Sequence, residues 1–114
     1  MSKKILIVYY SWSGNIKKIA KVIHKAIGGE LFEIEPITAY PKSYNYTVEQ
    51  AKKEINKDFL PKLKSTINTM EYDTIFVGSP NWWSTIAPPV ASFLTDNNFS
   101  GKTVIPFFHT AVAE

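Results

Sequence analysis

The 114-residue chain contains no cysteine and no arginine. Without cysteine it has no disulfide framework, no thiolate metal site, no iron–sulfur cluster and no thiol nucleophile. Its two histidines, His24 and His109, are too far apart in sequence to suggest a zinc site, so no metal centre is expected. All 13 basic residues are lysine, and arginine is the side chain whose planar fork reads guanine and binds phosphate bidentately. We therefore expect no nucleic-acid partner.

The chain also lacks a long hydrophobic run. No apolar segment approaches the roughly 20 residues of a membrane-spanning helix, so no membrane insertion is expected. Lys3 and Lys4 precede the short apolar run 5–10, which is too short for the core of a signal peptide, and residues 11–15 form no cleavage site. We therefore expect a cytoplasmic protein. With 45% hydrophobic and 20% charged residues, the composition is typical of one soluble globular domain, residues 1–114.

Apolar patterning predicts strands that alternate with helices. Strands are predicted at residues 5–10, 31–37, 74–78 and 102–108, and helices at residues 15–27, 47–57 and 89–96. Thr47 is expected to cap the second helix, and a short helix after Pro61 is left open. The segment 31–37 is expected at a sheet edge, because one of its faces is more polar than the other. The alternation predicts an α/β fold with a doubly wound parallel sheet, whose ligands bind beyond the carboxyl ends of the strands.

The turn between the first predicted strand and the first helix is a candidate phosphate site. Its sequence, Ser11-Trp12-Ser13-Gly14-Asn15-Ile16, combines two hydroxyls, an amide, a flexible glycine and the N–H groups of a helix start. The first helical turn has Lys17 and Lys18 and no acidic residue, an arrangement that a bound anion would relieve. The alternative is an ordinary capped turn with solvated lysines. Neither the GxGxxG fingerprint nor the P-loop motif is present.

The predicted loop after the third strand, residues 79–88, contains the adjacent tryptophans Trp82 and Trp83. Neighbours in an extended loop point in different directions, so one indole is free to lie over a flat ligand, and stacking gains about 0.5–1.5 kcal/mol beyond area burial. The alternative is that both serve the core or a protein interface. His109, expected just past the fourth strand, either donates to a ligand ring or is simply exposed. Three tyrosines of one loop either edge a ligand site or cover the sheet: Tyr40, Tyr44 and Tyr46.

Several segments, taken in order, resemble those of the flavodoxin family. They are the strand and turn 5–16, the second strand with GELFEIEP, the third strand and loop with DTIFVGSPNWWSTIAPPV, and the fourth strand with GKTVIPF. Together they cover essentially the whole chain. The resemblance implies a flavodoxin-like sheet with strand order 2-1-3-4 and FMN as the cofactor, bound where the strand order reverses.

The resemblance also implies which residues bind FMN. The ribityl phosphate is expected at the first turn and the isoalloxazine ring between the aromatic loops. The implied residues are Ser11, Trp12, Ser13, Gly14, Asn15 and Ile16 in the turn, Pro80, Asn81, Trp82 and Trp83 beside the flavin, and His109 and Thr110 at the start of a third flavin loop. Ile16 stands where the family usually has threonine, so only its backbone N–H remains for the phosphate. No residue is expected to act as a covalent catalyst.

The expected function is that of an FMN-binding redox flavoprotein, carrying electrons as a flavodoxin or as a quinone-reductase-like protein. Its partner would be a redox protein or a small-molecule acceptor such as a quinone. The alternative is a truncated flavodoxin-like interaction or regulatory module without turnover. The family usually continues past the position of Thr110 with a glycine-rich loop, a fifth strand and a last helix, and these are expected to be absent here.

The fourth strand would then have an open edge. Its apolar side chains Val104, Ile105, Phe107 and Phe108 are expected on that edge. Because open apolar edges recruit other strands, we expect a homo-oligomer or association with a complementary fragment.

Overall fold

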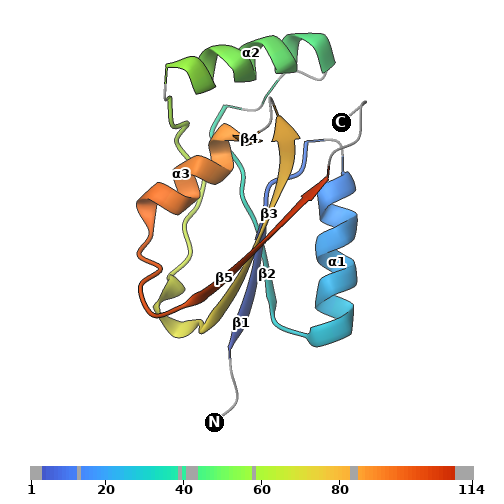
Figure 1. Cartoon of the computed structure of the whole chain (residues 1–114), viewed down its shortest axis with the longest axis vertical. Coiled ribbons are helices and arrows are strands. Elements are labelled where there is room, and N and C mark those ends of the chain that lie inside the picture. Colours follow the sequence, from blue (N-terminus) through green and yellow to red (C-terminus); the bar gives the residue numbers. More distant parts are fainter. Residues whose placement is uncertain are drawn as a thin grey trace.

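A parallel β-sheet covered by helices on both faces forms the protein (Figure 1). The computed structural model describes residues 4–12, 14–38, 40, 44–57, 59–82 and 85–109. The elements are β1 (Ile5–Tyr9), α1 (Asn15–Ile27), β2 (Glu30–Glu33), α2 (Tyr44–Asn56), the 3₁₀ helix η1 (Thr69–Glu71), β3 (Thr74–Trp82), β4 (Thr85–Ile86), α3 (Pro88–Asp96) and β5 (Thr103–His109).

The parallel strands lie in the order β2-β1-β3-β5, and β4 pairs antiparallel with the end of β3. This is the predicted order 2-1-3-4, because β5 is the fourth strand of that prediction. Tyr9 lies opposite Gly78, and Gly78 lies opposite Phe107, so the carboxyl ends of three strands share one edge of the sheet. The order reverses at β1, from which the chain first adds β2 on one side and then β3 on the other. The predicted doubly wound parallel sheet is confirmed.

Two clusters of buried side chains fill the two faces of the sheet. Successive residues of β1 point to opposite faces, and both faces are buried, as its continuous apolar run predicts. The cluster under α1 contains Ile7, Tyr9, Ile16 and Ala20. The cluster under α2 and α3 contains Leu6, Val8, Tyr10, Ile34, Tyr40, Ala51, Tyr72, Ile75, Val77, Ala87, Val90 and Phe93. The sheet is thus packed on both faces, and its strands position the candidate site residues.

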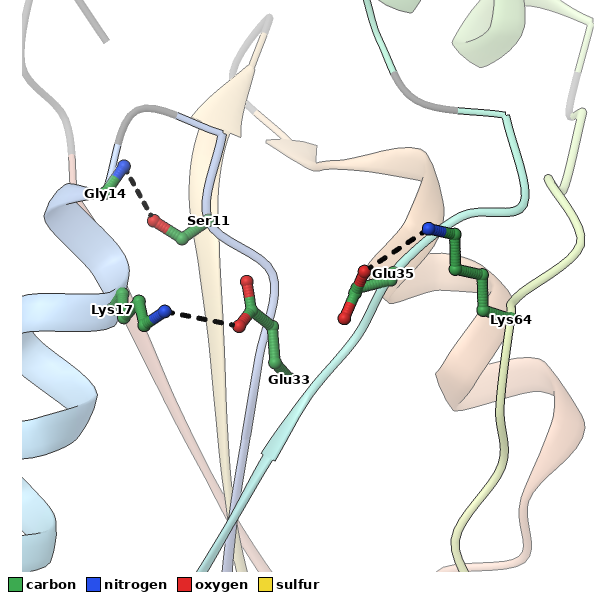
Figure 2. A network of polar contacts seen from close by, with 6 residues as sticks. All are labelled: Ser11, Gly14, Lys17, Glu33, Glu35 and Lys64. Carbon is green, nitrogen blue, oxygen red and sulfur yellow. Dashed lines mark hydrogen bonds and ion pairs between the residues drawn. The ribbon is translucent and has the colours of Figure 1, made fainter.

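The second predicted strand, residues 31–37, pairs with β1 in its first half and with the segment around Leu63 in its second half. β2 ends at Glu33, whereas the pattern predicted a strand over 31–37. Ile34 still donates its N–H to Tyr9 O at 2.7 Å, but Pro36 then forms an antiparallel bridge with Leu63. The segment around Leu63 is therefore extended, and residues 61–68 form no helix; the 3₁₀ helix η1 begins only at Thr69. An exposed ion pair, with Lys64 Nζ 3.6 Å from Glu35 Oε2, lies across the same two segments (Figure 2).

Two other predicted boundaries are wrong. β3 runs on to Trp82 in place of the expected loop from residue 79, because Asn81 pairs with Ile86 of β4 and Pro80 pairs with β5. α2 begins at Tyr44, three residues before the expected cap. Thr47 lies inside this helix and is buried, so it is a packing residue and not the N-cap.

Phe107 also differs from the expectation that it lies on an open edge. Its ring packs against the cluster under α1 and lies directly over Gly78. Val104, Ile105 and Phe108 are exposed as predicted.

Candidate functional site

Three predicted site segments meet at the carboxyl edge of the sheet (Figure 1). The turn that begins at Ser11 follows β1, Pro80 lies near the end of β3, and His109 ends β5. Pro80 and His109 are directly paired across the ladder. His109 was expected just past its strand, and this is wrong because β5 keeps its register with β3 as far as Pro80. The fold therefore brings the phosphate-type turn and two of the flavin-border positions to adjacent strands.

Ser11 and Gly14 close the turn after β1. The backbone N–H of Gly14 donates to Ser11 Oγ at 3.0 Å (Figure 2). Gly14 is the N-cap of α1 and has a φ of 98°, in the left-handed region that favours glycine. A Cβ built on Gly14 meets no atom of the described residues beyond its chain neighbours within 4 Å, so they leave the space beside it open.

The start of α1 provides the donors that an anion needs. Its N-cap, Gly14, has no side chain to bond the first turn, and that turn contains no acidic residue. Backbone N–H groups at a helix start attract anions through hydrogen bonds and the helix dipole. The N–H groups at the start of α1, with a glycine as the N-cap residue and space left open beside it by the described residues, form a donor set that fits a phosphate group.

Two side chains of the turn anchor it to the core on opposite faces. Ile16 is fully buried in the cluster under α1. Its side chain therefore does not reach a ligand, and only its backbone N–H is left for that role. Trp12 is partly buried and packs against the larger cluster on the other face. The turn is thus held by both layers of the fold.

An ion pair offsets one of the two lysines in the first turn of α1. Lys17 Nζ lies 3.6 Å from Glu33 Oε1, and both side chains are partly exposed (Figure 2). This ion pair weakens the expectation that Lys17 needs a bound anion. Glu33 also acts on Tyr9: burial, and then the charge and hydrogen bond of Glu33, raise the pKa of the Tyr9 phenol. Lys18 is exposed, and the structure shows no salt bridge for it among the described residues.

Ser79 is a positioning residue that the sequence analysis did not single out. It is buried, its Oγ accepts from the backbone N–H of Ala87 at 2.9 Å, and it donates to Pro80 O at 2.8 Å. It therefore joins β3 to the start of α3, across the hairpin that contains Asn81 and Trp82. A serine at the end of an apolar strand is the only local signal, and it does not reveal a partner eight residues away.

The comparisons with known proteins agree with this architecture. The family model described as Flavodoxin matches residues 4–113. The chain belongs to the flavodoxin family. This confirms the resemblance found in the sequence. No curated protein sequence matched the chain.

Solved structures of related flavodoxin-like proteins extend this result. Proteins classed as flavoproteins from Bacteroides eggerthii and Bacteroides uniformis both superpose with a TM-score of 0.85, at 30% and 31% sequence identity. The matches cover 94% and 95% of this chain, and 70% and 72% of those chains. A flavoprotein in complex with FMN from Lactobacillus acidophilus has a TM-score of 0.82 at 33% identity, covering 94% of this chain and 74% of that one. The flavodoxin-like fold expected from the sequence is confirmed.

Several predicted site residues stay predictions within this family assignment. Ser13, Trp83 and Thr110 lie outside the described residues. Asn81 and Trp82 are placed in the β3–β4 hairpin by their backbone pairing. Among the described residues, no helix has the length and apolar character needed to cross a membrane.

Proposed function

We propose that this flavodoxin-family protein is an FMN-binding redox flavoprotein. The observation that carries the proposal is the turn after β1, in which Ser11 and Gly14 precede a helix whose N-cap residue is a glycine and offers no capping side chain of its own. This turn lies where the strand order reverses, which is where open α/β sheets bind ligands. A structural relative at 33% identity is in complex with FMN, which supports the same ligand here.

In this proposal the turn holds the phosphate of FMN. The hydroxyls of Ser11 and Ser13 and the backbone N–H groups of Asn15 and Ile16 supply hydrogen bonds to it. Gly14 shapes the turn, because its own N–H donates to Ser11 Oγ and leaves the Ser11 hydroxyl hydrogen for the phosphate. Trp12 fixes the turn by packing against the core.

The flavin ring would lie between the β3–β4 hairpin and the end of β5. The residues proposed to border it are Pro80, Asn81, Trp82, Trp83, His109 and Thr110. The bound cofactor supplies reversible electron transfer, while the protein supplies binding, orientation and electrostatics. No side chain of the chain needs to form a covalent bond.

The electron acceptor is proposed to be a redox partner protein or a small molecule such as a quinone. The protein is proposed to act in the cytoplasm. The alternative, an interaction or regulatory module without turnover, requires that the chain does not take up FMN, so FMN titration separates the two.

The test is a titration of the purified chain with FMN, followed by flavin fluorescence. We expect saturable binding with quenching, because an indole stacked on the flavin quenches its emission. Ser13→Ala removes one hydrogen bond to a charged group, which costs about 1.5–3 kcal/mol, or about 10- to 150-fold in affinity. Ser100→Ala, at an exposed position after α3, is the matched control.

Unchanged FMN affinity in Ser13→Ala would remove the phosphate role of that serine. Bound FMN as bright as free FMN, or an unchanged spectrum when Trp82 and Trp83 are both alanine, would contradict stacking. A chain that takes up no FMN would overturn the proposed function and favour the module without turnover.

A further inference from the structure

A groove beside α2 shares no residue with the proposed FMN site. It consists of two adjoining cavities of about 590 and 460 Å³, whose linings share Gln50, Glu54, Phe59 and Leu60. The walls come from the chain after β2, the second half of α2 and the segment that follows this helix. These volumes fall within the roughly 300–1,000 Å³ of small-molecule sites.

Large apolar side chains form one part of the groove. Phe59 and Leu60 are 52% and 43% exposed, and Ile37 is exposed beside them. Soluble proteins rarely leave several large apolar side chains exposed together without a use for them.

Backbone hydrogen bonds hold this apolar surface in place. Phe59 donates its N–H to Glu54 O at 2.8 Å, and Ile37 donates its N–H to Lys62 O at 2.8 Å. Ser92 Oγ of α3 donates to Pro61 O at 2.6 Å and ties the same segment to the core. The walls are therefore fixed to α2, to the continuation of β2 and to α3.

The polar part of the groove is built around one carboxylate. Glu54 accepts from the Tyr40 hydroxyl at Oε1 and from Gln50 Nε2, 3.0 Å away, at Oε2. The Tyr40 ring is buried, and its centroid lies 6.1 Å from that of Tyr10, which holds the ring on the core side. Both carboxylate oxygens are thus occupied by donors from the protein.

The charge at the rim of the groove is positive. Lys53, Lys57 and Lys62 line it, against the single carboxylate of Glu54, so the described lining residues carry three positive charges and one negative charge, a net of +2. A ligand with an apolar body and a negative head matches this combination. The exposed aromatic ring of Phe59 favours an aromatic body, because aromatic pairs gain energy beyond area burial.

We propose that this groove binds a small aromatic carboxylate, with its ring against Phe59 and Leu60 and its carboxylate among the rim lysines. The cavity volumes and the hydrogen-bonded carboxylate favour a small molecule over a flat protein partner. The proposal is independent of FMN binding, because no residue of the groove belongs to the proposed cofactor site.

The experiment compares three probes with the same ring: 2-naphthoate, the neutral 2-naphthalenemethanol and the cationic 2-naphthylmethylamine. Binding to the whole chain is measured by calorimetry, and the site is located by amide NMR shifts. We expect 2-naphthoate to shift amides of residues 50–54 and 59–62, and to bind at least tenfold more tightly than the other two probes. Equal affinity for all three, shifts centred on β5, or no saturable binding at millimolar probe would overturn the proposal.

Surface variants locate the site further without disturbing the core. Leu60→Ser and Lys57→Gln each change an exposed residue and are expected to weaken 2-naphthoate binding at least fivefold. Phe108→Ser and Lys21→Gln change an exposed apolar residue and an exposed lysine elsewhere, and are expected to leave it unchanged. If the groove variants and the control variants weaken 2-naphthoate binding equally, the binding is non-specific and the proposal is overturned.

Added FMN separates this site from the proposed cofactor site. Retained 2-naphthoate binding at saturating FMN supports the groove, as does retained binding in a chain that takes up no FMN. Displacement of 2-naphthoate by FMN would place the probe in the cofactor site and overturn the proposal.

Discussion

Gly78 lies where the ring of Phe107 crosses β3. A Cβ on Gly78 would lie 2.3 Å from Cζ of Phe107 and 3.0 Å from Cγ2 of Ile16. The ring of Phe107 belongs to the cluster that packs β1, β3 and β5 against α1. Because Gly78 has no side chain, Phe107 of the neighbouring strand can reach the core. Gly78 lies two residues before Pro80 on β3.

We expect Gly78→Ala to lower the free energy of unfolding by about 1–3 kcal/mol, because overpacking forces neighbouring side chains to shift. The cost should shrink when Phe107 is replaced by leucine, since the ring that clashes is then gone. Urea denaturation of the two single variants and the double variant measures this coupling. An equal cost of Gly78→Ala in both backgrounds would show that the clash lies elsewhere.

At the scale of elements, Ser79 joins strand β3 to helix α3. Ala87, the N-cap of α3, is fully buried and donates its N–H to Ser79 Oγ. The chain between them forms the β3–β4 hairpin, so one hydroxyl fixes where the hairpin returns to the core. The helix starts with two prolines, which suit its first turn because they need no N–H partner there.

We expect Ser79→Ala to destabilise the protein by about 1–3 kcal/mol, because it leaves the buried N–H of Ala87 without this acceptor. Chemical denaturation measures the loss. Ser100→Ala, at an exposed position, should stay within about 0.5 kcal/mol of the parent. A loss in Ser79→Ala no larger than in this control would mean that another group takes over the bond.

At the scale of the whole molecule, tyrosines on both faces of the sheet have raised pKa values. Burial is the main cause of the raised pKa for Tyr9, Tyr10 and Tyr40. For Tyr72 the main cause is its hydrogen bond to Glu30, and its pKa rises to about 12. Above about pH 10 the unfolded chain releases these protons while the folded chain keeps them. Stability from these groups is therefore fully present below about pH 10 and is lost as the pH rises through the folded pKa values.

We expect the free energy of unfolding to fall with increasing steepness above about pH 10. Tyr40→Phe should make this decline shallower, because it removes one phenol that keeps its proton only in the folded state. Denaturation at several alkaline pH values, with phenolate absorbance as a second signal, measures both effects. Full ionisation of all tyrosines near pH 10 in the folded protein would contradict the raised pKa values.

The exposed side chains of strand β5 lead us to predict how copies of the chain associate. Among the described residues it pairs with β3 alone, and it exposes Val104, Ile105 and Phe108, the last by 47%. We expect the 114-residue chain to self-associate through this strand at micromolar concentration, because strand edges with apolar side chains recruit further strands. Sedimentation should show a species larger than a monomer, and Ile105→Lys should shift it towards the monomer.

Val22→Lys is the matched control for association, since Val22 is an exposed apolar residue on α1. Monomers at every concentration would contradict the predicted association.

Local patterns were enough to predict much of the fold. The continuous apolar run at 5–10 predicted a strand buried on both faces, which is β1 and ends one residue earlier at Tyr9, and the helical spacing from Asn15 to Ile27 predicted α1. The residues of the turn at 11–16 were recognised as a candidate phosphate site, because hydroxyls and glycine at a helix start are a local feature. The family resemblance then implied the strand order, which local patterning does not contain.

By itself, the sequence determined the type and order of the main elements, because apolar period and turn residues act over a few neighbouring positions. Only the tertiary structure decided that β3 continues to Trp82, that Pro36 turns to Leu63, and that Ser79 bonds Ala87. It also brought the segments of the groove beside α2 together. Each of these depends on hydrogen bonds or packing with a partner beyond the local window, and such partners become neighbours only after the chain has folded.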